Sequence, residues 1–507
     1  MNELFEVTAD DIAQLSDGDL RTLVGLLCEE EVRKRGLTTS AVRHGGSQDA
    51  PDGGLDVQVD LPNETPIDGW VPRPQTGFQV RKYSMPPRKI ASEMRPKGKP
   101  RPILEQLASR RGAYVIVSSG DSTSGTMHAC RVQAMQKAVA GLPNATAFKV
   151  EFYDRGRLAT WVRDHAGLML WVRNRAGRPL SGWQPFGPWA DNSYQNAGEY
   201  LSDNKLRIHL ANICRPHGIG SPQGLPALDG LHEIRELLRQ PGRAVRLVGL
   251  SGVGKTRFTQ ALFEASVGRA CLNPDLALYT NLSDDPNPQP AEFASQLIAM
   301  RKTGVLVIDN CRADLHARLA QICQAPQSTL SVITIEYDIH DDLPEETRVF
   351  RLDTSSPELI ENLIRRRFKH ISQVDANTIT KFSDGNAKVA LALAGTLRDN
   401  ETVGDLRDDG LLRRFIQQRQ PPDEALQLAA EVCSLVFSFN VDDVGPDSEL
   451  AHLGSLVEQS ALEMHRHVAE LLDRGVTQRR GPWRAICPTP SQTAWPRAPS
   501  EKFRPAR

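Results

Sequence analysis

The stretch GLSGVGKT, residues 249–256, has the residue types and the spacing of a phosphate-binding loop. Its glycines let backbone N–H groups turn toward the β-phosphate of a nucleotide, and the helix that follows adds partial positive charge. Lys255 can reach the β- and γ-phosphates, and the Thr256 hydroxyl can bind Mg²⁺. The sequence therefore predicts a site for ATP or ADP with Mg²⁺. The loop residues expected to bind the nucleotide are Gly249, Ser251, Gly252, Val253, Gly254, Lys255 and Thr256.

An acid for the same site ends a hydrophobic strand, GVLVIDN, at residues 304–310. Open α/β sheets bind ligands at the carboxyl ends of their strands, where this pattern puts Asp309. We expect Asp309 to hold Mg²⁺ through water, together with Thr256. The next residue is Asn310, where many hydrolytic ATPases have a glutamate, so hydrolysis should be slow. Glu336 ends a further strand and could sense the γ-phosphate or act as the base; a solvated acid at a strand end is the alternative.

A second group of reactive side chains lies in DGGLDV (52–57) and GFQVRKY (77–83). Asp56 at a strand end could bind a divalent metal with Gln79 as the second position, and a cation beside them could orient the water that attacks a phosphodiester. Arg81 faces the same way as Gln79 because side chains alternate along a strand. Arginine stays protonated, so it can stabilise negative charge but cannot act as a base.

Two further residues could complete this site. Lys82 is the nearest lysine, but it needs a bulge or a one-residue register shift to enter the site. Glu31, or its neighbour Glu30, lies beside the apolar stripe of the preceding helix and could add a metal ligand. The alternative is a structural α/β domain whose strands carry solvated charges.

The segment that follows, residues 81–102, is strongly basic and contains scattered prolines. It could track a phosphate backbone beside the metal site; a solvated loop is the alternative. No base-reading motif is visible, so binding should depend on the backbone and shape of DNA.

The patterns around these residues predict the elements that position them. Ser16 caps a helix in which Leu20, Leu23 and Leu27 follow at helical spacing. Helices and strands then alternate to about residue 165 in the order αββαβαβ, which indicates one α/β domain. A second α/β domain surrounds the phosphate loop, and helices followed by a hairpin come after it.

Composition is that of a soluble globular protein. The chain has 507 residues, of which 40% are hydrophobic and 24% charged. Its 61 Lys and Arg balance 62 Asp and Glu, so overall charge does not decide about nucleic acid. No apolar run approaches the roughly 20 residues of a membrane span, and the N-terminus lacks a signal-peptide core. Eight cysteines without a CxxC motif indicate reduced thiols. We expect a cytoplasmic protein with no membrane partner.

In this order, GLSGVGKT, VLVIDN, ITIEYD and FSDGNAKVALALAG, followed by a helical and winged-helix-like segment, resemble a STAND NTPase of the group that bacteria use in antiphage defence. The resemblance covers about residues 205–485. It implies that ATP binding and slow hydrolysis act as a switch, and that the active protein is a homo-oligomer. A continuously cycling motor is disfavoured by Asn310.

Members of this family usually carry a histidine after the wing that contacts phosphate. That position should follow WRAI, where this chain has CPTPSQTA. The abrupt change at Cys487 leads us to expect a frameshift or an early end, with a disordered tail after it. MHRH, residues 464–467, is similar to the histidine motif but is expected on a helix surface.

The N-terminal motifs resemble the PD-(D/E)xK fold and, within it, Mrr-type restriction endonucleases, over about residues 10–155. The resemblance implies a Mg²⁺-dependent DNA endonuclease with Asp56 as metal ligand and with Gln79, Arg81, Lys82 and Glu31 as further catalytic residues. Two functions follow: an ATP-controlled endonuclease, or a non-catalytic nucleotide-binding regulator whose N-terminal domain only binds DNA or a partner.

Together these observations predict an α/β multidomain protein. Its parts are a restriction-endonuclease-like α/β domain (1–165), a linker with a helical element (166–225), a P-loop NTPase domain with a parallel sheet (226–400), a helical and winged-helix-like domain (401–486) and a Pro/Arg-rich tail (487–507).

Overall fold

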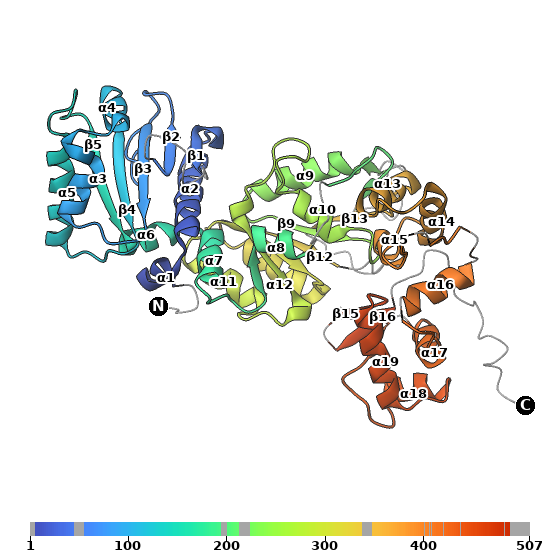
Figure 1. Cartoon of the computed structure of the whole chain (residues 1–507). Coiled ribbons are helices and arrows are strands. Elements are labelled where there is room, and N and C mark those ends of the chain that lie inside the picture. Colours follow the sequence, from blue (N-terminus) through green and yellow to red (C-terminus); the bar gives the residue numbers. More distant parts are fainter. Residues whose placement is uncertain are drawn as a thin grey trace, which may run out of the picture. The chain divides into compact units, whose positions relative to one another are not determined.

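The chain forms two compact units, Met1–Leu180 and Ser181–Arg507, each with its own sheet (Figure 1). None of the helices in the described ranges combines the length and the apolar composition that crossing a bilayer requires. The structure is a computed structural model and describes residues 6–44, 55–193, 200–211, 224–336, 347–399, 401–404, 406, 408–418, 420–436, 438–480 and 482–486.

The described part of the first unit is built on a mixed sheet with the strand order β1-β2-β3-β4-β5. β1, β2 and β3 pair antiparallel, whereas β3, β4 and β5 pair in parallel. On one face, Ile90 of α3 and Leu104 of α4 pack with Tyr114 of β4. On the other face, Phe78 of β3 lies 6.3 Å from Trp161 of α6, measured between ring centroids. The elements are α1 (Ala9–Gln14), α2 (Asp17–Arg33), η2 (Thr39–Ala41), β1 (Val42–His44), β2 (Val57–Asp60), β3 (Gln75–Arg81), α3 (Pro87–Met94), η3 (Pro96–Gly98), α4 (Pro102–Ser109), β4 (Ala113–Ser118), α5 (Gly125–Val139), β5 (Lys149–Asp154), α6 (Arg155–Val162) and α7 (Ala166–Arg175).

Most elements of this unit follow the sequence pattern. α2 begins after Ser16, whose hydroxyl accepts a hydrogen bond from the Asp19 N–H at 3.0 Å, and Leu23 is fully buried. The predicted order did not include the helices α1, α3, α6 and α7 or the strand β1. β1 is only three residues long, and α3 lies in the basic segment, where the scattered prolines suggested a loop. Pro86 and Pro87 instead begin that helix, because proline fits the first helical position.

The second unit contains a sheet with the order β6-β10-β11-β12-β9-β13-β7-β8 among its described residues. The central strands β10, β11, β12, β9 and β13 pair in parallel, which confirms the predicted parallel sheet. β12 separates β9, which leads into the phosphate loop, from β11, which ends at Asp309. The elements around this sheet are β6 (Trp183–Pro185), α8 (Phe186–Ser193), β7 (Arg207–Ala211), β8 (Leu225–Pro226), α9 (Ala227–Arg239), β9 (Ala244–Val248), α10 (Lys255–Ala261), η4 (Pro274–Leu276), β10 (Ala277–Asn281), η5 (Leu282–Asp284), α11 (Pro290–Ala299), β11 (Gly304–Asp309), α12 (Ala313–Cys323), β12 (Leu330–Ile335) and β13 (Arg348–Leu352).

Helices and a small sheet complete the second unit. α13, α14, α15 and α16 share one apolar core, and α17, α18 and α19 share another. α19 leads into the hairpin of β15 and β16, which agrees with the predicted helix and hairpin, while the winged-helix assignment stays a prediction. Residues 487–507, the predicted tail, lie outside the described residues. The elements are α13 (Pro357–Arg367), α14 (Gln373–Ser383), α15 (Ala387–Ala394), α16 (Asp408–Gln417), α17 (Glu424–Cys433), β14 (Phe439–Asn440), α18 (Glu449–Ser455), α19 (Ala461–Asp473), β15 (Thr477–Arg480) and β16 (Trp483–Ile486).

The predicted linker over residues 166–225 is corrected by the structure. α7 belongs to the first unit, where its Leu168 and Leu170 are buried. β6 and β7 pair with β10 and β13 of the second unit. Trp183 and Trp189 are 2% and 0% exposed there. The Gly- and Pro-rich composition suggested a linker, but its aromatic side chains are packed.

Candidate functional site

The phosphate loop connects β9 to α10 and depends on its glycines. Gly249, Gly252 and Gly254 have φ of 147°, 82° and 99°, a region that glycine occupies without steric cost. A Cβ on Gly252 would lie 2.3 Å from Asn386 Oδ1 at the start of α15. Asn386 Nδ2 also donates a hydrogen bond to the Ser251 carbonyl at 2.8 Å. Asn386 therefore fixes the loop, a role that the Gly-Asn turn in the sequence did not reveal.

The loop lysine, the hydroxyl and the distant acid come together as predicted. Lys255 Nζ donates to the carbonyls of Gly249 at 2.7 Å and Leu250 at 2.8 Å, which keeps the ammonium over the loop. Thr256 Oγ1 donates to Asp309 Oδ2 at 2.7 Å. A phosphate bound in this loop would meet the lysine on one side and the hydroxyl–carboxylate pair on the other.

Asp309 has the surroundings of a cation ligand. It is 9% exposed, and its Oδ1 accepts the Asn310 backbone N–H at 2.9 Å. Burial raises the pKa of the Asp309 carboxyl, and the hydrogen bond from Thr256 and the charge of Lys255 oppose this only in part. A bound cation would favour the ionised carboxylate, and Mg²⁺ prefers such oxygen ligands. Thr256 and Asp309 therefore fit a Mg²⁺ ion that accompanies a nucleotide.

A cavity of about 540 Å³ opens beside the loop and has two chemically different sides. The loop and Asp309 supply polar groups, and Arg366 and Arg367 of α13 add positive charge. An apolar wall with a few polar groups is typical of sites for small ligands, and here it suits a nucleotide base. The wall consists of Leu201, Leu206, Ile335, Leu352, Leu359, Leu363 and Leu391.

The residues that could act as the base for hydrolysis differ in their surroundings. Asn310 Nδ2 donates to Asn281 Oδ1 at 2.8 Å. Because an amide cannot take a proton from water, Asn310 does not serve as a base. Glu336 is 6% exposed and lines the cavity, so it is not the solvated acid that we considered as the alternative.

The hairpin of β15 and β16 reaches the same site from the C-terminal part of the unit. Gln478 Nε2 donates to Ser251 Oγ in the phosphate loop. Ser283 Oγ donates to the Arg479 carbonyl at 3.0 Å, and Asn310 Nδ2 lies 3.4 Å from Ser283 Oγ. The hairpin thus contacts the loop directly, and Ser283 of η5 links it to Asn310 after β11.

The strand order, the loop between β9 and α10 and the acid that ends β11 define a nucleotide-binding fold of the P-loop NTPase class. No protein-family model and no curated protein matches the chain.

Two solved structures are among those similar to parts of the chain. One is a signal transduction ATPase with numerous domains (STAND) protein with a tetratricopeptide repeat sensor from Pyrococcus horikoshii, with 13% identity and a TM-score of 0.27 over 54% of this chain and 41% of that chain. Another is the replication initiator DnaA bound to AMPPCP and single-stranded DNA, with 11% identity and a TM-score of 0.26 over 48% of this chain and 86% of that chain. The match spans less than half of the first structure. TM-scores this low do not establish a shared fold, so the class rests on the loop and the strand order.

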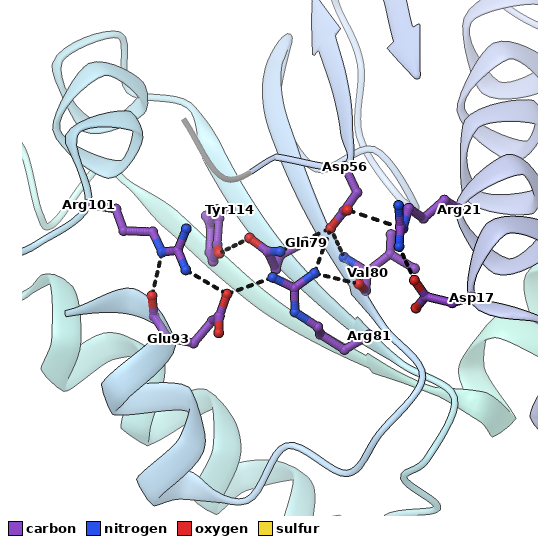
Figure 2. A network of polar contacts seen from close by, with 9 residues as sticks. All are labelled: Asp17, Arg21, Asp56, Gln79, Val80, Arg81, Glu93, Arg101 and Tyr114. Atoms are coloured by element: carbon purple, nitrogen blue, oxygen red, sulfur yellow. Dashed lines mark hydrogen bonds and ion pairs between the residues drawn. The ribbon is translucent and has the colours of Figure 1, made fainter. Parts of the chain in front are cut away.

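In the first unit, the predicted constellation assembles around Asp56 (Figure 2). Its Oδ2 accepts hydrogen bonds from the Gln79 amide at 3.0 Å, the Val80 N–H at 2.8 Å and Arg81 Nη1 at 3.2 Å. Its Oδ1 lies 3.3 Å from Nε of Arg21 on α2. The structure therefore brings Asp56, Gln79 and Arg81 together as the strand pattern predicted. It adds Arg21, which no motif in the sequence indicated.

Arg81 also makes a second ion pair. Its Nη2 donates to Glu93 Oε1 at 2.8 Å, and Arg101 pairs with the same carboxylate at 2.8 Å. Burial alone lowers the pKa of Arg81, but Glu93 and Asp56 outweigh it and raise the pKa above its usual value. The guanidinium therefore carries its charge at any physiological pH.

Two predicted residues do not join this cluster. Lys82 follows the last residue of β3 and is exposed. Glu31 lies ten positions after Arg21 on α2, which is about 15 Å along a helix axis. The helical period correctly predicts which face of α2 carries Glu31. It does not predict which position along the helix axis lies beside the ends of the strands. Asp52 lies outside the described residues.

Glu31 belongs to a different, buried cluster. It accepts from Lys34 Nζ at 3.3 Å and from Trp161 Nε1 at 3.3 Å. His165 lies 3.8 Å from Glu31 and 3.7 Å from Glu30. Although burial raises the pKa of Glu31, His165 and Lys34 outweigh it and lower the pKa to about 2. Burial lowers the pKa of His165, but the two glutamates outweigh it and raise the pKa.

This cluster predicts a pH-dependent stability. Because the pKa of His165 is raised on folding, its contribution is complete below the ordinary pKa of about 6.5 and is lost as the pH rises through the folded value. We expect the free energy of unfolding to fall as the pH rises above about 6.5, and His165→Gln to flatten this slope. Chemical denaturation followed by circular dichroism measures both, with His128→Gln as the matched control. Equal slopes in wild type and His165→Gln would contradict the assignment.

Proposed function

We propose that this chain is a cytoplasmic, ATP-binding switch protein of the STAND type that acts in antiphage defence, and that its nucleotide state controls its N-terminal domain. The observation that carries the proposal is the meeting of the Thr256 hydroxyl and the Asp309 carboxylate at 2.7 Å beside the glycine loop. The STAND type and the defence role are supported by the order of the sequence motifs.

The residues of the site divide the work of binding. The loop N–H groups and Lys255 hold the phosphates, and the apolar wall of the cavity holds the nucleotide base. Mg²⁺, when bound with the nucleotide, neutralises phosphate charge and is held by Thr256 and Asp309. Because Asn310 cannot act as a base, hydrolysis should be slow, which supports a switch rather than a motor.

The C-terminal hairpin gives the switch an output. Gln478 donates a hydrogen bond to Ser251 of the loop, so a change of charge in the loop would alter a contact of the hairpin. We propose that exchange of ADP for ATP alters this contact and frees the helical, winged-helix-like domain for assembly into a homo-oligomer.

For the first unit we propose a restriction-endonuclease-like domain that binds DNA. Its basic segment exposes several cations on and around α3, as a surface that follows a phosphate backbone requires. The second candidate is the metal-dependent endonuclease that the sequence resemblance implies, and the meeting of Asp56, Gln79 and Arg81 supports it. The exposed cations are Lys82, Arg88, Lys89, Lys97 and Lys99.

A single experiment tests the switch and its target. The full chain is mixed with supercoiled plasmid or a labelled duplex and Mg²⁺, with ADP or with a non-hydrolysable ATP analogue. We expect binding that is tighter with the ATP analogue, weakens with salt, and leaves the plasmid intact. Lys82→Glu with Lys89→Glu should weaken binding, whereas Lys369→Glu, an exposed lysine of the second unit, should not.

Each other result has a distinct meaning. Equal binding in both nucleotide states would contradict the switch. No binding in either state would contradict the DNA proposal. Mg²⁺-dependent cleavage that Asp56→Ala abolishes would replace DNA binding alone with the endonuclease.

A further inference from the structure

Asp56 is part of a continuous chain of alternating acidic and basic side chains (Figure 2). Arg21 and Arg81 flank Asp56, and Arg81 continues to Glu93. This series of ion-paired side chains runs from α2, past the ends of β2 and β3, to α3. Its members in order are Asp17, Arg21, Asp56, Arg81, Glu93 and Arg101.

We infer that the Arg81 guanidinium takes the place of a divalent metal ion at Asp56, so that this constellation is an ion-pair centre that excludes Mg²⁺. The inference deepens the proposed function of the first unit, because it states why the domain would bind DNA without cutting it. It depends on the geometry around Asp56 and not on whether DNA is bound.

The oxygens that could bind a metal here are already engaged by hydrogen-bond donors or by an arginine. Three N–H groups donate to Asp56 Oδ2, and the charged Arg21 side chain lies 3.3 Å from Oδ1 as an ion pair. Gln79 directs its amide nitrogen to Asp56, while its oxygen accepts from the Tyr114 hydroxyl at 3.2 Å. The Val80 carbonyl accepts from Arg81 Nη1 at 3.0 Å. A Mg²⁺ ion needs near-octahedral oxygen ligands at about 2.1 Å, which requires these donors to leave.

Charge acts in the same direction. The charges of the three carboxylates and three guanidinium groups in this series balance, so the centre is neutral without a metal. A divalent cation at Asp56 would face the guanidinium groups of Arg21 and Arg81 at close range, and arginine cannot lose its proton to relieve the repulsion. In the described ranges, no group of three or more His, Cys, Asp or Glu side chains is arranged to hold a metal ion.

The same contacts give Arg81 a positioning role. Arg81 begins the basic segment, Arg101 lies next to its end, and both form ion pairs with Glu93 between them. Glu93 thereby ties the two ends of this segment to the sheet. The exposed lysines and arginines between them are held on a fixed framework, as binding to a phosphate backbone favours.

Mn²⁺ binding to the full chain, followed by electron paramagnetic resonance without nucleotide or DNA, tests the inference. All proteins carry Asp309→Asn so that the nucleotide site does not contribute. We expect the same Mn²⁺ binding with and without Asp56→Asn. Arg81→Ala should gain one bound Mn²⁺ per chain, and Asp56→Asn should abolish that gain.

Two results would overturn the inference. One is loss of a bound Mn²⁺ when Asp56→Asn is added to the Asp309→Asn protein, because Asp56 would then hold metal beside Arg81. The other is a folded Arg81→Ala protein that gains no Mn²⁺. If Arg81→Ala does not fold, the first comparison still decides, and Arg81→Gln takes its place in the second. DNA binding is absent from this assay, so the inference and the proposed function can fail separately.

Discussion

Replacing Lys255 with alanine should lower the affinity for ATP by about 100-fold, since each hydrogen bond to a charged group contributes about 1.5–3 kcal/mol and 1.4 kcal/mol is a factor of ten. Lys255 is the cation that the structure holds directly over the phosphate loop, through the carbonyls of Gly249 and Leu250. A phosphate that enters the loop would accept the hydrogen bonds that these carbonyls now accept. The remaining loop N–H groups cannot supply a full positive charge.

Titration with a fluorescent ATP analogue in the presence of Mg²⁺ measures this loss. Lys369→Ala is the matched control, because Lys369 is an exposed lysine of the same unit that does not line the cavity. Circular dichroism should be unchanged in both variants, since Lys255 is not part of an apolar core. ATP binding within a few fold of wild type in Lys255→Ala would sink the phosphate-loop assignment and, with it, the proposed switch.

The nucleotide site was largely predictable because its central part is contiguous. Eight neighbouring residues carry the loop, and a hydrophobic strand that ends in an acid is visible on its own. The residues that shape the loop from outside were not predictable. Asn386 reaches Ser251 across 135 positions and Gln478 across 227, and no local pattern links residues so far apart.

The N-terminal site was predictable only where strand geometry fixes direction. Gln79 and Arg81 share a face because a strand alternates, and the structure brings both to Asp56. Glu31 was misplaced because a helical period gives a face and no position along the axis. The ion pair of Arg81 with Glu93 could not be predicted, because Glu93 lies on α3 and the prolines of this segment suggested a loop. The sequence could therefore show that a cation stands beside Asp56, but not that the cation closes the site.

Burial of charge is the feature that the sequence hid most completely. Arg235 lies in the amphipathic helix α9, where a charged residue is expected on the wet face. It is instead 0% exposed. Its guanidinium donates to the backbone carbonyls of Ala261, Leu262, Glu264, Val267 and Arg269 at 2.6–3.1 Å. These carbonyls belong to the end of α10 and the segment after it, so Arg235 fastens the helix that begins at the phosphate loop.

Replacing Arg235 with methionine should destabilise the second unit by about 3–5 kcal/mol, because several buried carbonyls lose their donors while a similar volume is kept. The loss should appear as a lower midpoint in chemical denaturation of the full chain and as weaker protection by ATP against thermal unfolding. Arg243→Met is the control, since Arg243 is exposed and its side chain donates locally, to Gln240. A midpoint for Arg235→Met equal to that of the control would mean that water satisfies these carbonyls and that α10 is held by its apolar contacts alone.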